Sequence, residues 1–287
     1  MRSPCYIGHI VDIDYCGGRV IDNYIEANKA AWEEAFDNRK NNWGENDHIK
    51  LQSEPFAFFN RDILEKLKNT DFKGKTVAQF CCNNGRELLS LVLNSGAASG
   101  VGFDIAENIL GQAKQMAEKA GVKNCEFVNC NILDISMDYY NKFDFMFITL
   151  GAICCFKDLT VLFEKVEKCL KPGGTFLLND GHPFAYMLPI PGNDAFDPYN
   201  LNRLTYPYFK KSPWIWTGGM YYISGDCESK PFTEFPHTVS DIINAVCVNN
   251  MRITTFNEYD YEIGGIGSEV YDEKGIPLSY ILVAEKV

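Results

Sequence analysis

The residues best placed to do chemistry follow a short apolar run, Thr76 to Phe80. They form a tight turn of small and polar residues, Cys81-Cys82-Asn83-Asn84-Gly85, which leads into an apolar segment from Glu87 to Leu93. This order predicts a strand, a turn and the start of a helix. The free N–H groups at a helix N-terminus favour polar or anionic groups, and small turn residues let a ligand approach the backbone. The turn is therefore the first candidate for a ligand-binding loop in an α/β protein.

A second candidate is Asp104, which ends the next predicted strand and lies 25 positions after Gln79. An acid at the carboxyl end of the second strand of such a fold commonly accepts hydrogen bonds from a ribose diol. The alternative is an N-cap for the helix that begins at Ala106. Position favours the ribose role.

Two histidines are candidates for acid–base chemistry. His182 directly follows the predicted strand 175–178, and in open α/β sheets the carboxyl ends of the strands border the ligand crevice. His237 lies at the start of a later predicted helix, where capping that helix is the alternative role. No nucleophile-elbow motif supports a hydrolase.

Apolar runs and helical periodicities alternate along the chain. The predicted strands are Thr76 to Phe80, Ser99 to Asp104, Cys125 to Val128, Phe143 to Leu150 and Thr175 to Leu178. Helices are predicted at residues 87–93, 106–120 and 157–170. Such alternation favours a doubly wound sheet with right-handed crossovers. A helix from Thr238 to about Asn249 and two strands, 252–259 and 278–283, are expected to complete the fold with an antiparallel edge.

An amphipathic helix is predicted near the N-terminus, where apolar residues share one helical stripe. The stripe consists of Ile21, Tyr24, Ile25, Trp32, Ala35 and Phe36, interrupted by Asn28. The helix either packs on the main domain or closes a ligand pocket with Tyr24, Asn28 and Trp32. Residues 37–50 are polar and predict a loop, and a further helix is expected over residues 56–68.

The alternation breaks between Gly181 and Pro236. This stretch has 13 aromatic residues among 56, against 39 in the 287 residues of the whole chain. So long an insertion in an α/β domain is usually a lid or a substrate-binding cap. Aromatic residues suit a pocket for a ligand with apolar and polar parts, and they suit an oligomer interface equally well.

Composition limits the classes of partner. The net charge of −11 argues against general affinity for nucleic acids or anionic membranes, and no apolar run reaches the roughly 20 residues that span a bilayer. The eleven cysteines include two adjacent pairs but no C-x-x-C, which favours core thiols over a metal site or a disulfide framework. A reducing, cytoplasmic location is expected.

Taken in order, these motifs resemble the class I S-adenosylmethionine-dependent methyltransferases from about Lys75 to the C-terminus. They look most like the bacterial small-molecule enzymes with an N-terminal helical lid. V-A-Q-F-C-C-N-N-G-R at 77–86 matches the family's V-L-D-L-G-C-G-T-G-R, and Asp104 in GVGFDIAENIL matches its strand-two acid. Cys130-Asn131-Ile132-Leu133 matches a G-D-x-x-D/L loop. FDFMFITLGAI resembles the fourth strand, and the L-K-P-G-G turn at 170–174 is reproduced letter for letter.

The resemblance implies a Rossmann-like, doubly wound, seven-stranded and mostly parallel sheet with an antiparallel last strand, plus N-terminal helices and an inserted cap. It divides the chain into a helical lid (1–70), a methyltransferase core (71–180 and 238–287) and a substrate-binding cap (181–237). The implied cofactor is S-adenosyl-L-methionine, with no metal. The implied cofactor-binding residues are Gln79, Cys81, Asn83, Gly85, Asp104, Ile105, Asn131, Ile132, Leu150, Tyr24 and Trp32, the last two as aromatic faces near the sulfonium.

Some positions depart from the family pattern. Gln79 replaces an acid, and Cys81 and Asn83 replace glycines. Asn131 stands where the family often has Asp, and its side-chain carbonyl still accepts a hydrogen bond. The predicted function is methyl transfer to a small molecule, mainly through positioning, with His182 and His237 on the acceptor side. The alternative is a catalytically decayed, cofactor-binding or regulatory protein of the same fold. An NAD-type enzyme is less well supported, because G-x-G-x-x-G is absent.

Overall fold

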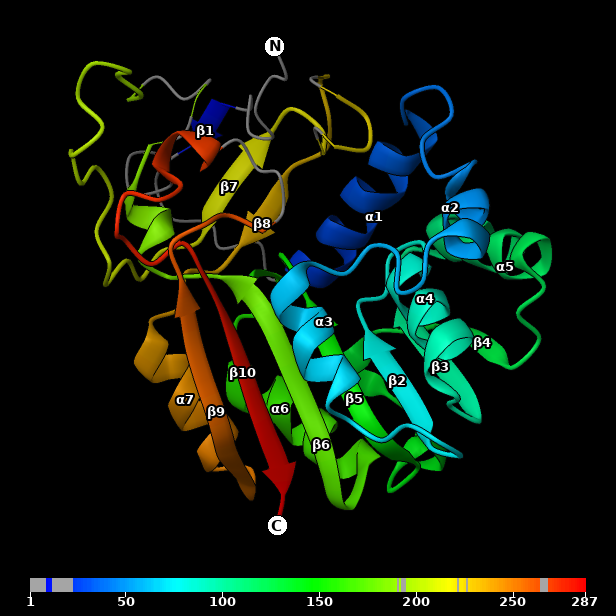
Figure 1. The fold of residues 1–287 in the computed structure, drawn as a ribbon. Helices are drawn as coiled ribbons and strands as arrows, with labels where there is room; N and C mark the ends of the chain where they lie inside the picture. The colour runs from blue at the N-terminus through cyan, green and yellow to red at the C-terminus, as the bar shows by residue number, and fades with distance from the viewer. Residues whose placement is uncertain are drawn as a thin grey trace.

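The computed structural model describes residues 9–11, 23–189, 191, 195–220, 222–225, 227–263 and 268–287. Its centre is a seven-stranded sheet with the order β4-β3-β2-β5-β6-β10-β9 (Figure 1). The strands are β2 (Thr76–Phe80), β3 (Ser99–Asp104), β4 (Cys125–Asn129), β5 (Phe143–Thr149), β6 (Leu170–Gly181), β9 (Met251–Tyr259) and β10 (Ser279–Lys286). Strands β2 to β6 are parallel to their neighbours in this group, whereas β10 is antiparallel to both β6 and β9. The predicted fold class is confirmed.

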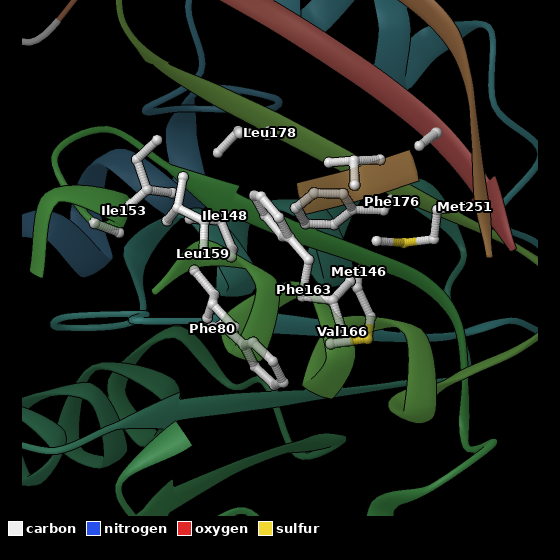
Figure 2. Close-up of a cluster of buried hydrophobic side chains, with 14 of the residues drawn as sticks. Phe80, Met146, Ile148, Ile153, Leu159, Phe163, Val166, Phe176, Leu178 and Met251 are labelled. Atoms are coloured by element: carbon white, nitrogen blue, oxygen red, sulfur yellow. The ribbon is translucent and has the colours of Figure 1, made fainter. Parts of the chain in front are cut away.

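Helices cover both faces of the sheet (Figure 1). One face packs against α3 (Arg61–Lys68), α4 (Arg86–Ser95) and α5 (Glu107–Ala120), and the other against α6 (Leu159–Cys169) and α7 (Val239–Cys247). Because side chains alternate along a strand, Phe145 and Phe147 of β5 join the first cluster, and Met146 and Ile148 join the second. Figure 2 shows the second cluster, in which Phe163 of α6 lies among these buried side chains. Burying each such side chain contributes about 1.5 to 3 kcal/mol.

A second, three-stranded sheet lies with α1 (Tyr24–Asp37) beyond the carboxyl ends of the parallel strands (Figure 1). Its antiparallel strands are β1 (His9–Val11), β7 (Trp214–Thr217) and β8 (Phe232–Glu234), in the order β1-β7-β8. The insertion at 181–237, which we call the cap, therefore shares its sheet with a strand from the N-terminal segment. The buried side chain of Asn28 ties α1 to this sheet, because it donates to Thr233 O (2.8 Å) and accepts from Thr233 N (2.7 Å).

The structure differs from the sequence expectations around α1 and α3. Residue Ile21 of the predicted stripe lies outside the described residues. Residues 37–50 are not all loop, because α2 (Asp47–Ser53) begins within them. The helix expected from residue 56 starts only at Arg61, since Phe56 and Phe58 have left-handed φ angles of 55° and 74°. Asn60 caps it by accepting hydrogen bonds from the N–H groups of residues 62 and 63.

The capping-box start of α7 is confirmed: the Thr238 side chain accepts from Asp241 N, and the Asp241 carboxylate accepts from Thr238 N. Among the described helices none is long and apolar enough to cross a membrane.

Candidate active site

A cavity of about 450 Å³ opens at the carboxyl ends of β2, β3 and β5, and α1 and the cap roof it. Its sheet side includes Gln79, Cys81, Asn83, Glu87, Asp104, Ile105, Asn131, Ile132, Thr149 and Leu150. Its roof includes Ile25, Asn28, Trp32, Met220, Tyr222 and Glu234. Nine of the eleven cofactor-binding residues predicted from the sequence line this cavity, and the other two, Tyr24 and Gly85, do not. Their role in binding a cofactor stays a prediction.

The turn after β2 has a left-handed, glycine-like backbone at two residues that are not glycine. Cys81 and Asn83 have φ angles of 53° and 52°, in the left-handed region. This conformation costs on the order of 1 to 2 kcal/mol at a residue with a Cβ, somewhat less at Asn. The Asn83 side chain accepts from Asn84 N (2.8 Å) and donates to the Tyr222 hydroxyl of the cap (3.3 Å). Asn83, which stands where the resembling family has a glycine, therefore links the turn to the cap.

Gly85 ends the turn as the N-cap of α4, with φ 71°. A Cβ at this position would lie 2.4 Å from the ring of Phe127 and 3.1 Å from the Cβ of Ala113. Gly85 thus allows α4 to pack closely on α5 and β4, and its effect on the cavity is through the backbone.

Asp104 joins two loops at the edge of the cavity. One carboxylate oxygen accepts from Asn83 N (2.8 Å) and the other from Ala106 N (3.0 Å). Burial raises the pKa of the Asp104 carboxyl above its ordinary value, and these two N–H groups oppose part of the rise. Helix α5 begins at Glu107 with Ala106 as its N-cap, so Asp104 turns the chain into the helix and also faces the cavity.

A carboxylate that the sequence did not single out restores negative charge beside Gln79. The amide nitrogen of Gln79 donates to Glu87 Oε2 (2.7 Å) and to the Thr149 hydroxyl (3.0 Å), and that hydroxyl donates to the same oxygen of Glu87. Gln79 Oε1 is buried and has no hydrogen-bond partner among the described residues. Glu87 lies in the first turn of α4, eight residues after Gln79, and only the fold shows that the two meet.

The loop after β4 brings Asn131 and Ile132 to the cavity. Asn131 Oδ1 accepts from Leu133 N (3.1 Å), and its Nδ2 donates to Asp134 (2.7 Å). An amide oxygen has a second lone pair, so Oδ1 keeps capacity for a ligand donor. Ile132 begins a short 3-10 helix and is almost fully buried.

The two aromatic residues predicted from α1 have different surroundings. Trp32 lines the cavity and meets Phe232 of β8 edge to face, with ring centroids 5.5 Å apart. Tyr24 packs edge to face on Phe235 at 4.8 Å and is not among the lining residues. Trp43 and Tyr222, which the sequence interpretation did not assign to the cofactor, line the cavity in addition.

Neither predicted acid–base histidine lies in the cavity lining. His182 is buried between β6 and the last strands, where Nδ1 accepts from Phe184 N (3.0 Å) and Nε2 lies 2.9 Å from Glu258 of β9. His237 Nε2 lies 2.9 Å from the carbonyl oxygen of Phe156, to which it donates. Burial lowers the pKa of both imidazoles. His182 follows the carboxyl end of β6, as expected, but its ring packs edge to face on Tyr280 of β10, the strand beside β6, and it is not among the residues that line the cavity.

The acid that does reach the cavity from the cap is Glu234, at the end of β8. Burial, with a smaller contribution from the nearby Asp180 carboxyl, raises the pKa of the Glu234 carboxyl to about 7. A hydrogen bond from the Trp216 indole opposes part of this rise. Asp180, at the end of β6, accepts from the N–H groups of Gly151 (2.8 Å) and Gly181 (2.7 Å), and burial raises its pKa to about 6. No motif marks Glu234 in the sequence, where it stands between Phe232-Thr233 and Phe235-Pro236.

Two cysteines that line the cavity are neutral thiols. Burial raises the pKa of Cys81 and Cys82 well above the ordinary value, so neither is a thiolate nucleophile. Within the part of the chain that the structure describes, no group of three or more His, Cys, Asp or Glu side chains could hold a metal ion.

Comparison with known proteins agrees with this geometry. Residues 71–195 match the family described as "Methyltransferase domain". A demethylmenaquinone methyltransferase of Lactococcus lactis subsp. lactis (strain IL1403) is 28% identical over 139 residues, which cover 47% of this chain and 52% of the relative. The match therefore spans about half the length of that curated relative.

Solved structures show the same architecture. A candidate S-adenosylmethionine-dependent methyltransferase from Listeria monocytogenes superimposes with a TM-score of 0.60 at 20% identity, over 78% of this chain and 97% of its own. An S-adenosylmethionine-dependent methyltransferase from Mesorhizobium loti gives 0.56 at 21% identity, over 77% of this chain and 96% of its own. By sequence, residues 71–195 thus match a methyltransferase domain, and the chain shares the fold of these S-adenosylmethionine-dependent methyltransferases.

Proposed function

We propose that this chain transfers a methyl group from S-adenosyl-L-methionine to a small-molecule acceptor. The observation that carries the proposal is the turn at residues 81–85. It keeps a left-handed backbone at two non-glycine residues, is fixed by Asp104, and opens onto a cavity roofed by α1 and the cap. Folds retain such a costly backbone where function requires it, here the close approach of a ligand to the turn.

The polar groups of the cavity fit this cofactor. The buried, unpartnered Gln79 Oε1 beside the Glu87 carboxylate suits an ammonium group, which is a donor only. The Asp104 carboxylate suits the two hydroxyls of a ribose. Asn131 Oδ1 suits an adenine amino group, with Ile132 and Leu150 as apolar contacts for the ring.

The bound cofactor supplies a methyl group on a positively charged sulfur, already activated toward a nucleophile. The protein's residues then need mainly to orient the acceptor, and such orientation accounts for about 7 to 11 kcal/mol of barrier lowering in well-aligned reactions. The aromatic face of Trp32 contributes on the order of 0.5 to 2 kcal/mol to holding a positive charge nearby.

The acceptor side of the cavity is formed by the lid and the cap in this proposal. Residues 1–70 provide Trp32 and Asn28, and residues 181–237 provide Met220, Tyr222 and Glu234. The aromatic and apolar side chains suit an acceptor of metabolite size with an apolar part.

Isothermal titration of the purified chain with S-adenosyl-L-methionine tests the proposal, with NAD⁺ as a comparison ligand. We expect one site with a Kd in the micromolar range and no binding of NAD⁺. The absence of a binding heat at millimolar S-adenosyl-L-methionine would contradict the proposal. Cofactor binding without labelled methyl transfer to any component of a small-molecule cell extract would favour the alternative, a binding or regulatory protein.

A further inference from the structure

The position of Glu234 in the cap suggests more than a structural role. Strand β8 is held by hydrogen bonds on both sides of this residue. The backbone N–H and C=O of Thr233 pair with the side chain of Asn28 in α1. Phe235 N donates to Cys154 O (2.7 Å), in the 3-10 helix that follows β5. The backbone that carries Glu234 is therefore held to both the lid and the core. Its side chain lines the main cavity and also a small adjoining pocket.

The surroundings of Glu234 are unusual for a carboxylate that serves only the fold. Its neighbours are the Trp216 indole, which donates to it, and the carboxyl of Asp180. Within the described ranges no lysine or arginine forms an ion pair with it. Buried carboxylates that maintain structure are generally paired with a cation. An unpaired one in a cavity, with a single neutral donor, is able to gain and lose a proton near neutral pH.

We propose that Glu234 is the residue that removes a proton from the methyl acceptor, and that the acceptor is an uncharged or cationic small molecule with an O–H or N–H group. This inference rests on the proposed methyl transfer and assigns the role predicted for His182 and His237 to a residue that reaches the cavity.

The charges of the cavity restrict the acceptor. Its described lining holds three carboxylates, Glu87, Asp104 and Glu234, and a single cation, Arg86. The Arg86 guanidinium lies over the Phe58 ring, 5.3 Å from its centroid. An acceptor that carries phosphate or several carboxylates would meet net repulsion here.

The step balances without a further reactant. A lone pair of the acceptor oxygen or nitrogen attacks the methyl carbon, and the bond from that carbon to sulfur breaks with both electrons going to sulfur. The acceptor proton passes to a carboxylate oxygen of Glu234. The positive charge of the sulfonium and the negative charge of Glu234 are both cancelled, and a methyl ether or methylamine, a thioether and a neutral carboxylic acid remain.

The test compares wild type with Glu234→Gln, which keeps an oxygen for the Trp216 indole, and with Glu228→Gln, an exposed glutamate of the same cap that lines neither pocket. Titration calorimetry with S-adenosyl-L-methionine comes first. We expect all three proteins to bind it within threefold of one another. A tenfold weaker affinity in Glu234→Gln alone would overturn an acceptor-side role, whereas no binding by wild type would mean that the proposed function itself has failed.

Transfer of a labelled methyl group is then measured with two probe sets: protic acceptors (a series of phenols and primary amines) and acceptors that lose no proton (pyridines and thioethers). We expect Glu234→Gln to lower the rate with protic probes by about 10²- to 10⁴-fold and to change the rate with the others less than threefold. Equal loss with both sets, or none, would overturn the proposal. Failure of cofactor-bound wild type with every protic probe would overturn the acceptor class.

The pH profile supplies a readout that a structural role would not move. The groups that face Glu234 are Asp180 of β6, Cys154 of the helix after β5 and, across the small pocket, His237. With protic probes the wild-type rate should rise with pH through the ionisation of Glu234, and this limb should disappear in Glu234→Gln but persist in Glu228→Gln. A limb retained in Glu234→Gln would assign the titration to one of the neighbouring groups.

Discussion

The Glu87 carboxylate accepts a hydrogen bond of 2.7 Å from the Gln79 amide, so the cavity regains the negative charge that strand β2 itself lacks. We therefore predict that Glu87→Gln weakens binding of S-adenosyl-L-methionine by about 10- to 100-fold, the effect of removing a charged hydrogen-bond partner. Titration calorimetry measures it. Glu107→Gln, in the first turn of the neighbouring α5 and exposed, is the matched control and should bind like wild type.

The double variant Gln79→Glu/Glu87→Gln tests whether charge rather than position matters. The double variant moves the carboxylate to position 79 of β2, where the family that this chain resembles has an acid. We expect its affinity for S-adenosyl-L-methionine to return to within about fivefold of wild type. Wild-type affinity in Glu87→Gln would contradict the assignment of this carboxylate to the cofactor.

Asp104 connects the turn after β2 with the start of α5, and its carboxylate faces the cavity. We expect Asp104→Ala to lower cofactor affinity at least 30-fold, since two charge-assisted hydrogen bonds to a diol are each worth about 1.5 to 3 kcal/mol. Asp138→Ala, exposed beyond β4 and outside the cavity lining, is the control. Unchanged cofactor affinity in Asp104→Ala would show that the carboxylate only fixes the turn after β2 and the start of α5.

Gly85 offers a test of the turn that is independent of any ligand. A Cβ there would meet Phe127 at 2.4 Å, on a backbone with φ 71°. Gly85→Ala should lower the free energy of unfolding by about 2 to 4 kcal/mol in urea titrations. Gly111→Ala, within α5 and with no atom beyond its own stretch of helix within 4 Å of the added Cβ, should be neutral or stabilising by up to about 1 kcal/mol. Similar effects of the two changes would contradict the described packing of the turn.

Helix α1 is tied to β8 of the cap through Asn28, whose side chain pairs with both backbone groups of Thr233. Asn28→Ala leaves that N–H and C=O unpaired in a buried place and should cost roughly 2 to 4 kcal/mol of local stability. Hydrogen exchange of residues 24–37 and 232–234 measures the loosening. Glu26→Ala, on the exposed side of α1, should leave exchange unchanged; protection retained in Asn28→Ala would mean that other contacts hold the lid.

Stability should depend on pH through Glu234. Its folded-state pKa of about 7 lies above the ordinary value of 4.5, so the folded state holds its proton more tightly. The stability that this proton confers is complete below about pH 4.5 and is lost as pH rises through 7. Between pH 5 and 8, wild type should lose roughly 2.5 kcal/mol relative to Glu234→Gln. Urea titrations across this range measure the difference, in which the titrating groups remote from Glu234 cancel. Parallel pH dependences would contradict the raised pKa.

Strands such as β2 and β5 could be predicted because each is a short apolar run bounded by turn residues, whereas β6 also contains the segment 170–174 that was expected as a turn. The limits of β2 and β3 match the predicted ones, and β10 pairs antiparallel with β9 as expected. The start of α3 could not be predicted, because the positive φ values of Phe56 and Phe58 depend on packing that no local pattern encodes.

The sheet side of the cavity could be predicted from the sequence, because it is built from strand ends, whose order along the chain is their order in the motif. Two carboxylates that line the cavity could not be predicted. Glu87 lies in the first turn of α4 and contacts Gln79 of β2 only once the chain has folded. Glu234 reaches the cavity because it lies on β8, in a sheet that the cap forms with the N-terminal strand β1. His182 was expected at the cavity because it follows a strand, but a side chain at a strand end can lie toward either face of the sheet. Here the His182 ring packs on Tyr280 of β10.

The most direct test of the cofactor site is a crystal structure of the chain with S-adenosyl-L-homocysteine. We expect ligand density in the 450 Å³ cavity, with the ribose hydroxyls on Asp104, the amino group beside Glu87 and Gln79 Oε1, and adenine next to Asn131 and Ile132. Ligand density elsewhere, or a cavity that stays empty at saturating ligand, would contradict it.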